Sequence, residues 1–216
     1  MGLAHSPRIV TDGLVLALDA ANTKSYPSSG GSTWYDLSGN GNNGTIIGGS
    51  VTHSSDSGGV FVLPGTTGNY INVPINLTNT TYTVMGASRY VTIGGRTFSS
   101  INNNWLMGHW SNSTVKHYAE GWVTDSGGSE ESDTNWRLYA ATGDYSADSW
   151  AFYVNGQLET GPNNGGSNGP NGIQIGRHGN SEYSNSQISF LFAYNRVLTA
   201  SEIQQNFNAL RGRFGI

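Results

Sequence analysis

The chain lacks cysteine and is poor in charge, and these shortages exclude several classes of protein. With no Cys among 216 residues, disulfides, thiolate nucleophiles and Cys-ligated zinc are excluded. Charged residues make up only 11% of the chain, and Lys occurs twice, which excludes long-helix and coiled-coil proteins. A formal net charge of −4 gives no electrostatic footprint for nucleic acid, and no apolar run is long enough to span a membrane. We therefore expect neither nucleic acid nor a membrane as a partner.

Small and polar uncharged residues are abundant in this chain. The counts are Gly 31, Ser 26, Asn 23 and Thr 19, while aromatic residues still reach 11%. Disordered chains have few aromatics and high net charge, so this composition favours a folded protein with many turns. The length suits one domain, and no repeat or linker divides the chain.

Ten short segments carry apolar or alternating patterns and are separated by clusters of Gly, Ser, Asn and Asp. No helical pattern lies between them, which predicts an all-β protein built as an antiparallel sandwich. The expected strands are residues 14–18, 60–63, 70–73, 81–91, 105–110, 118–123, 136–141, 150–155, 173–176 and 188–194.

The end of the chain predicts one short helix. Thr199 and Glu202 have the spacing of a capping box, and Ile203, Phe207 and Leu210 form one apolar stripe. Gly212 is placed to end this helix. The expected organisation is an arm at 1–13, a sandwich at 14–198, and a capped helix with a tail at 199–216 in the same domain.

Both ends carry basic and apolar residues that would suit docking. Arg8 and Ile9 lie in the arm, and Arg213, Phe214 and Ile216 lie in the tail. Two alternatives stay open: these segments fold back on their own domain, or they dock on a partner in an assembly.

Three elements together resemble a laminin-G-like module of the concanavalin A-like lectin/glucanase superfamily. They are Leu18-Asp-Ala20 with Trp34-x-Asp36-x-Ser-Gly-Asn-Gly-Asn-x-Gly44, then Trp150-x-Phe-Tyr-Val-Asn-Gly156, then Ile175-Gly-Arg177 with Tyr194-Asn-Arg-Val-Leu-Thr-Ala-Ser-Glu-Ile203. They occur in the family's order and span most of the chain. The resemblance implies that the antiparallel sandwich is a two-sheet jelly roll.

A narrower resemblance points to virion structural proteins of tailed phages, especially those of marine and cyanobacterial hosts. It rests on Gly86-Ala-Ser-Arg-Tyr90, Asn104-Trp-Leu-Met-Gly-His-Trp110 and Gln204-Gln-Asn-Phe-Asn-Ala-Leu-Arg-Gly-Arg-Phe-Gly215. This implies a decoration, neck or tail-appendage role, other virion proteins as partners, and a homo-oligomer as one candidate state. The expected location is the outer surface of a particle assembled in the host cytoplasm, since residues 1–7 lack the apolar core of a signal peptide.

A structural Ca²⁺ is the one cofactor that the sequence indicates. Asp36, Asn40 and Asn42 place three oxygen ligands within seven residues, although Asn and Asp also stabilise turns by bonding their own backbone. Many modules of this family carry acidic residues before the Tyr-Asn-Arg motif, whereas this chain reads Ile188-Ser-Phe-Leu191. That departure weakens the calcium interpretation and favours the turn.

Catalysis is not expected. Glucanases of the resembled family often carry Glu-x-Asp-x-x-Glu, and the nearest segment is Glu131-Ser-Asp133, where Trp136 replaces the second Glu. A single acid without a partner cannot serve as both proton donor and nucleophile. A glycoside hydrolase is therefore the third and disfavoured hypothesis.

Glycan binding is the chemistry best represented, because sugar recognition combines aromatic faces with polar groups. If the strands at 105–110 and 118–123 pair in register, His109, Tyr118, Glu120 and Trp122 build one patch; the alternative is that the Trp side chains are core. Arg177 and Tyr183, in a polar loop, form a second candidate. The leading hypothesis is thus a non-enzymatic virion structural protein with weak glycan adhesion, and the second is a lectin-type adhesin for host envelope carbohydrate.

Overall fold

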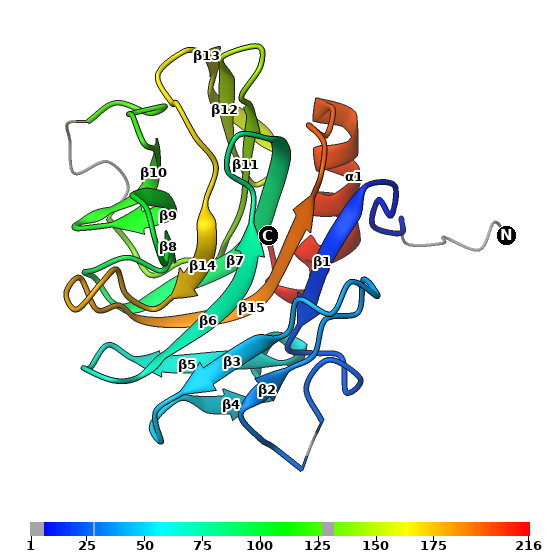
Figure 1. Cartoon of the computed structure of the whole chain (residues 1–216). Helices are drawn as coiled ribbons and strands as arrows, with labels where there is room; N and C mark the ends of the chain where they lie inside the picture. Colours follow the sequence, from blue (N-terminus) through cyan, green and yellow to red (C-terminus); the bar gives the residue numbers. More distant parts are fainter. Residues whose placement is uncertain (1–6, 28, 127–131) are drawn as a thin grey trace, which may run out of the picture.

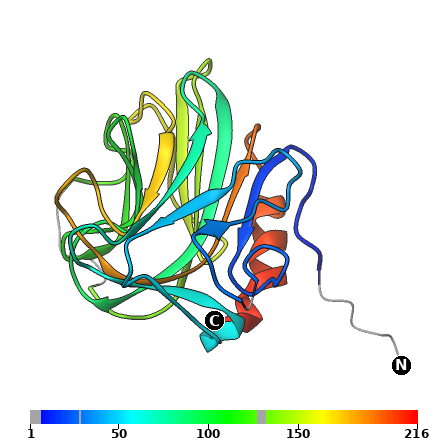
Figure 2. The same cartoon turned by 60° about the horizontal axis from the view of Figure 1, so that its bottom comes forward.

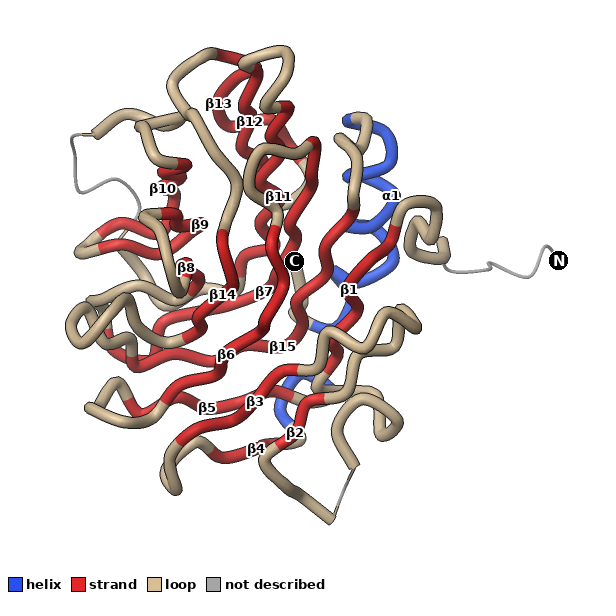
Figure 3. The backbone as a smooth tube through the Cα atoms, viewed as in Figure 1, coloured by secondary structure: helices blue, strands red, loops and turns tan. Residues whose placement is uncertain are grey.

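The computed structural model describes residues 7–27, 29–126 and 132–216. Two antiparallel sheets pack face to face, and one α-helix lies outside them, alongside β1 and β15 (Figures 1 and 3). The all-β sandwich with one short C-terminal helix, as expected from the strand spacing, is confirmed. Within the described residues, no helix has the length and apolar character needed to cross a membrane.

Sheet A has eight strands in the order β13-β12-β11-β7-β15-β5-β4, and β1 also pairs with β15. Its longest strands, β7 and β15, pair along most of their length in the middle of the sheet. The strands are β1 (Leu14–Asp19), β4 (Thr52–Ser54), β5 (Val60–Pro64), β7 (Thr81–Thr92), β11 (Arg137–Asp144), β12 (Ser149–Val154), β13 (Gln157–Asn163) and β15 (Asn185–Tyr194).

Sheet B has seven strands in the order β10-β9-β8-β14-β6-β3-β2. Half of its neighbouring pairs, β8-β14, β14-β6 and β6-β3, join strands that are not consecutive in the chain, which is what a jelly-roll connection produces. The strands are β2 (Thr33–Trp34), β3 (Gly44–Ile47), β6 (Tyr70–Asn76), β8 (Phe98–Ser100), β9 (Trp105–Trp110), β10 (Ser113–Ala119) and β14 (Asn171–Ile175).

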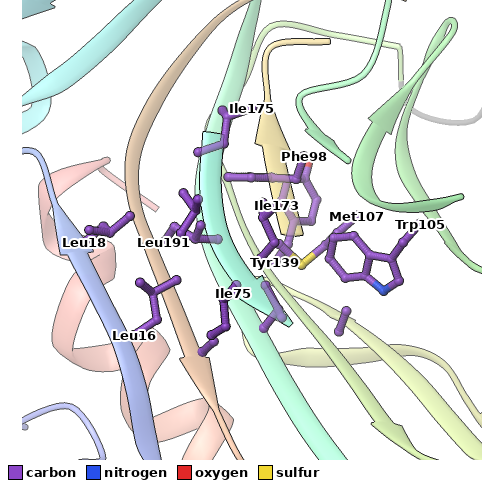
Figure 4. Close-up of a cluster of buried hydrophobic side chains, with 14 of the residues drawn as sticks. Leu16, Leu18, Ile75, Phe98, Trp105, Met107, Tyr139, Ile173, Ile175 and Leu191 are labelled. Carbon is purple, nitrogen blue, oxygen red and sulfur yellow. The ribbon is translucent and has the colours of Figure 1, made fainter. Parts of the chain in front are cut away.

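The main core lies between the two sheets. Leu16, Trp105, Tyr139, Ile173 and Leu191 are among its fully buried members, drawn from both sheets (Figure 4). Because alternate residues of a strand face opposite sides, this core fixes which residues of sheet B face outward.

A second core covers the outer face of sheet A. Helix α1 (Ala200–Leu210) lies beside β1 and β15 (Figure 2). It buries Ile203, Phe207 and Leu210 against that sheet, in the predicted stripe. The capping box is confirmed. The Thr199 hydroxyl accepts from the Glu202 amide, and the Glu202 carboxylate accepts from the Thr199 amide. The helix ends at Leu210, and a 3₁₀ turn, η2 (Arg211–Arg213), follows it directly. Gly212 lies inside this turn and does not end the helix.

The described part of the arm, residues 7–13, and the tail pack against this second core. Ile9, Phe214 and Ile216 pack partly buried against it, and the Phe214 ring lies 4.8 Å from that of Trp136. Arg213 pairs with Asp19 at 3.0 Å. These side chains fold back on their own domain, which is the first of the two alternatives, and docking on a partner stays a prediction. Arg8 is exposed, and its carbonyl accepts from the Gln205 side chain.

Deleting residues 211–216 is therefore expected to lower the free energy of unfolding by about 2–4 kcal/mol, from lost apolar burial and a partly buried ion pair. Equilibrium urea unfolding of the shortened and full-length chains measures this. Phe214→Ala should reproduce roughly half of the loss. Equal midpoints for the full-length and shortened chains would mean that the tail contributes nothing to its own domain.

Candidate functional site

A row of outward-facing residues crosses sheet B from edge to edge. Each member is the direct cross-strand partner of the next, and their sequence neighbours, such as Trp34, Ile71, Ile173, Phe98 and Met107, belong to the core between the sheets. The row is Thr33, Thr45, Asn72, Gln174, Ser99, Leu106 and Tyr118. We call it the polar row.

The middle of the polar row retains unused hydrogen-bonding capacity. Gln174 is 4% exposed and donates its amide nitrogen to the Asn72 side chain at 3.1 Å. Its carbonyl oxygen is buried and has no partner among the described residues. A buried acceptor without a donor costs about 1–3 kcal/mol, so a ligand hydroxyl reaching it would be favoured.

Three aromatic side chains gather where the polar row ends. Trp122 lies between Trp110 and Tyr118, with ring centroids 5.1 Å and 5.0 Å away. All three are half-buried, and Trp122 forms an isolated β-bridge with Tyr118 just beyond the end of β10. We call these residues the aromatic cluster; their packing holds the rings in place while part of each remains open to solvent.

Two charged residues, Glu182 and Arg96, hold one ring of the aromatic cluster in place. Glu182 accepts from the Trp110 indole nitrogen at 2.9 Å and pairs with Arg96 at 2.8 Å. Arg96 also donates to the Asn104 side chain at 2.7 Å, so its charge is compensated within the protein. Burial lowers the Arg96 pKa, and the neighbouring Glu182 opposes that shift. Sequence reasoning missed Arg96 and Glu182, which lie far apart in the chain and carry no motif.

The predicted patch of four residues is corrected by the strand register. Tyr118 pairs with Leu106 and His117 with Met107, so Tyr118 shares its face with Leu106 and not with His109. His109 is fully buried between the sheets, 3.1 Å from the Ser88 hydroxyl, with its ring 4.1 Å from that of Tyr90. Burial lowers its pKa to about 3, which makes it a neutral core residue.

Glu120 is exposed but lies in a turn, because β10 ends at Ala119 and Glu120 has a positive φ of 55°. The strand expected at 118–123 thus begins earlier and stops sooner. The Glu120 carboxylate accepts from the Asn104 amide at 2.7 Å, which closes this turn against the start of β9. Tyr118 and Trp122 are brought together as predicted; Trp110, on the same face, replaces His109.

The loop that carries Arg177 and Tyr183 contacts the aromatic cluster through a different residue, Glu182. The Arg177 guanidinium lies 3.4 Å from the centroid of the Tyr70 ring. The Tyr183 hydroxyl donates to the Asn180 carbonyl at 2.8 Å, a contact within the loop. Tyr70 is two residues from Asn72, so Arg177 borders the polar row.

The candidate calcium residues form a hydrogen-bonded turn. One oxygen of Asp36 accepts from the amides of Ala17 and Ser38, and the other accepts from the Ser38 hydroxyl and the Asn42 amide. Four bonds use the lone-pair sites of a carboxylate, which fits the turn alternative and does not fit a calcium ligand. The Asn42 side-chain nitrogen donates to the Val15 carbonyl, and that of Asn40 to Ser38. No group of three His, Asp or Glu in the described ranges is arranged to hold a metal.

The acidic segment weighed for glycoside hydrolysis lies partly outside the described residues, since Glu131 is not among them. Asp133 forms a 2.6 Å ion pair with Arg137. The hydrogen bond from Arg137 lowers the Asp133 pKa to about 2. A general acid needs a raised pKa, so Asp133 is placed for structure and not for proton donation.

No protein-family model matches the chain, and a search of curated proteins gives no match. Solved structures do share the fold. Domain 4 of AbnA, a GH43 extracellular arabinanase from Geobacillus stearothermophilus solved with arabinotriose, has a TM-score of 0.66 and 20% identity over 89% of this chain and 97% of that domain.

Two toxin structures match over about half of their own length. The binding domain of Paraclostridial Mosquitocidal Protein 1 has a TM-score of 0.67 and 17% identity, covering 92% of this chain and 52% of that chain. The binding domain of Botulinum Neurotoxin DC in complex with SialylT has a TM-score of 0.65 and 19% identity, covering 93% and 52%. These likenesses confirm the jelly-roll sandwich; the resemblance to phage virion proteins stays a prediction.

Proposed function

We propose that this protein is a non-enzymatic, carbohydrate-binding jelly-roll domain that uses the outer face of sheet B. The observation that carries the proposal is the polar row ending on the aromatic cluster. Sugars present hydroxyls beside apolar C–H faces, so a ligand lying along this face would bond Asn72 and Gln174 and stack on Trp122. The Gln174 oxygen has no partner among the described residues, but it is buried, so a sugar hydroxyl would have to displace neighbouring atoms to reach it.

The two outer faces differ in a way that supports this assignment. Helix α1, the arm and the tail cover sheet A with apolar contacts, so that face is committed to folding. Within the described residues, no helix covers sheet B, and its polar row is exposed at Thr45 and half-buried at Thr33, Asn72 and Tyr118, while Gln174, Ser99 and Leu106 are buried. Two fold neighbours were solved with bound sugars, arabinotriose and SialylT, which adds support by analogy.

A glycan array of the purified chain tests this proposal. We expect saturable binding to a subset of immobilised glycans, confirmed by calorimetry with the free oligosaccharide. Hydrolysis of the bound glycans is not expected, because Asp133 is held ionised by Arg137 and Glu120 is bonded in a turn. An array without saturable binding would overturn the proposal, and release of reducing sugar would overturn its non-enzymatic part.

The finer assignment is a virion structural protein of a tailed phage, as a decoration, neck or tail component facing outward. Its support is the sequence resemblance, and glycan adhesion to a host envelope would suit an exposed position. A free lectin-type adhesin is the alternative. Quantitative mass spectrometry of purified particles decides between them: hundreds of copies indicate decoration, a few to dozens indicate neck or tail, and absence moves the assignment to the adhesin.

A further inference from the structure

A cavity of about 520 Å³ opens at one end of the sandwich, apart from the aromatic cluster. It lies where β6 ends, β7 begins, β15 ends and β1 begins, so both sheets contribute to its walls. Its volume falls within the range of pockets that hold small molecules. No part of the polar row or the aromatic cluster lines it.

The chemistry of the walls is uniform. The polar side chains that line the cavity are amides and hydroxyls: Asn40, Asn42, Asn76, Asn195, Thr80 and Thr81. The remaining lining residues, Val15, Ile75 and Leu77, are aliphatic, and no charged residue lines the cavity within the described part of the chain. A charged ligand would lose its hydration there without gaining a counter-charge, so the walls select a neutral one.

Several wall groups are free to bond a ligand. Asn40 and Asn42 use their amide nitrogens on Ser38 and Val15, which leaves their side-chain oxygens as acceptors. Asn76 uses its oxygen on Thr78, which leaves its amide nitrogen as a donor. Donors and acceptors beside aliphatic carbon match a compound that carries several hydroxyls on a C–H framework.

The wall is also rigid before any ligand arrives. The four bonds accepted by Asp36 fix the turn that carries Asn40 and Asn42, and tie it to Ala17 in β1. Preorganised groups lose little conformational entropy on binding. The backbone at the start of β7 is held as well, since the Tyr145 amide donates to the carbonyl of Thr80.

We propose that this cavity is a second binding site, specific for a neutral sugar unit, and that the asparagines of the 36–42 turn contact it directly. The site is independent of the proposed function, because none of its residues belongs to the polar row or the aromatic cluster. The turn that resembled a calcium loop in the sequence thus serves as a rigid wall for a neutral ligand.

Titration of the full chain with single sugars, followed by amide NMR, tests this site. The probes are glucose, galactose, mannose, arabinose and N-acetylglucosamine, each up to 50 mM, with glucuronate as the charged comparison. At least one neutral probe should shift the amides of residues 40, 42, 76 and 195 saturably, and glucuronate should bind at least tenfold more weakly than the best neutral probe.

Asn195→Trp should fill the cavity and weaken this binding at least tenfold, and Asn40→Ala, at an exposed position, should weaken it severalfold if the tryptophan variant does not fold. Asn164→Ala, an exposed asparagine elsewhere, is the matched control. Trp122→Ala should leave these shifts intact, which separates this site from the aromatic cluster. The inference is overturned if no neutral probe shifts these amides, if glucuronate binds as well as the best neutral probe, or if both cavity variants bind normally.

Discussion

Trp122→Ala should weaken glycan binding at least thirtyfold while the protein stays folded. Trp122 is the central ring of the aromatic cluster, in contact with both Trp110 and Tyr118. Central aromatic anchors of binding sites contribute about 2 kcal/mol or more, and 1.4 kcal/mol corresponds to a factor of ten in affinity. Calorimetry with the best oligosaccharide from the array measures the loss, and near-UV circular dichroism reports whether the fold is kept.

A matched control separates lost stacking from lost stability. Tyr153→Ala removes another half-buried ring, but on the helix-covered face of sheet A, so it should lower stability without changing glycan affinity. Trp122→Phe should recover most of the binding, because it keeps a ring between Trp110 and Tyr118. Asn72→Ala should weaken binding through the polar row alone. Unchanged affinity in both Trp122→Ala and Asn72→Ala would place the glycan site elsewhere.

Acidification from pH 6.5 to 4.5 should destabilise the protein by about 5 kcal/mol through two buried histidines. His109 and His117 are fully buried, and desolvation lowers their pKa values to about 3 and about 4. Below pH 6.5 the unfolded chain gains a proton at each site while the folded chain does not. Stability is therefore fully present above pH 6.5 and declines as pH falls toward the folded-state pKa values, at about 1.4 kcal/mol per pH unit for each histidine.

Urea unfolding at half-unit pH steps measures this slope. Hydrogen bonds from Arg137 and Arg196 lower the pKa values of Asp133 and Glu202 to about 2. These two carboxylates therefore titrate mainly below this pH range and do not obscure the slope. His109→Gln should reduce the slope by about half, whatever its effect on stability at pH 7. An unchanged slope in His109→Gln and in His117→Gln would show that both rings take up protons in the folded state.

The sandwich could be predicted from the sequence, whereas the polar row could not. Short apolar runs between Gly, Ser and Asn clusters indicated most strands, and Thr199 with Glu202 marked the helix, because both signals are local in sequence. Short strands such as β2, β4 and β8 escaped notice, since three residues or fewer carry no periodicity. Without β2 and β8 the polar row could not be assembled.

The placement of His109 shows a further limit. Alternation alone puts it on a face of β9 with Trp105 and Met107, which is right, since all three are buried in the core. The relative register of β9 and β10 then decides whether Tyr118 joins that face, and a shift of one residue reverses the answer. Sequence alternation supplies the two faces of each strand but not how neighbouring strands match.

By itself the sequence determined the absence of cysteine chemistry, the all-β class and the capped C-terminal helix. Each follows from composition or from contacts within a few residues. The tertiary structure decided that the arm and tail cover sheet A and that Arg96 and Glu182 hold the aromatic cluster in place. These features join residues tens to hundreds of positions apart, and such contacts depend on how the sheets pack, which no local pattern encodes.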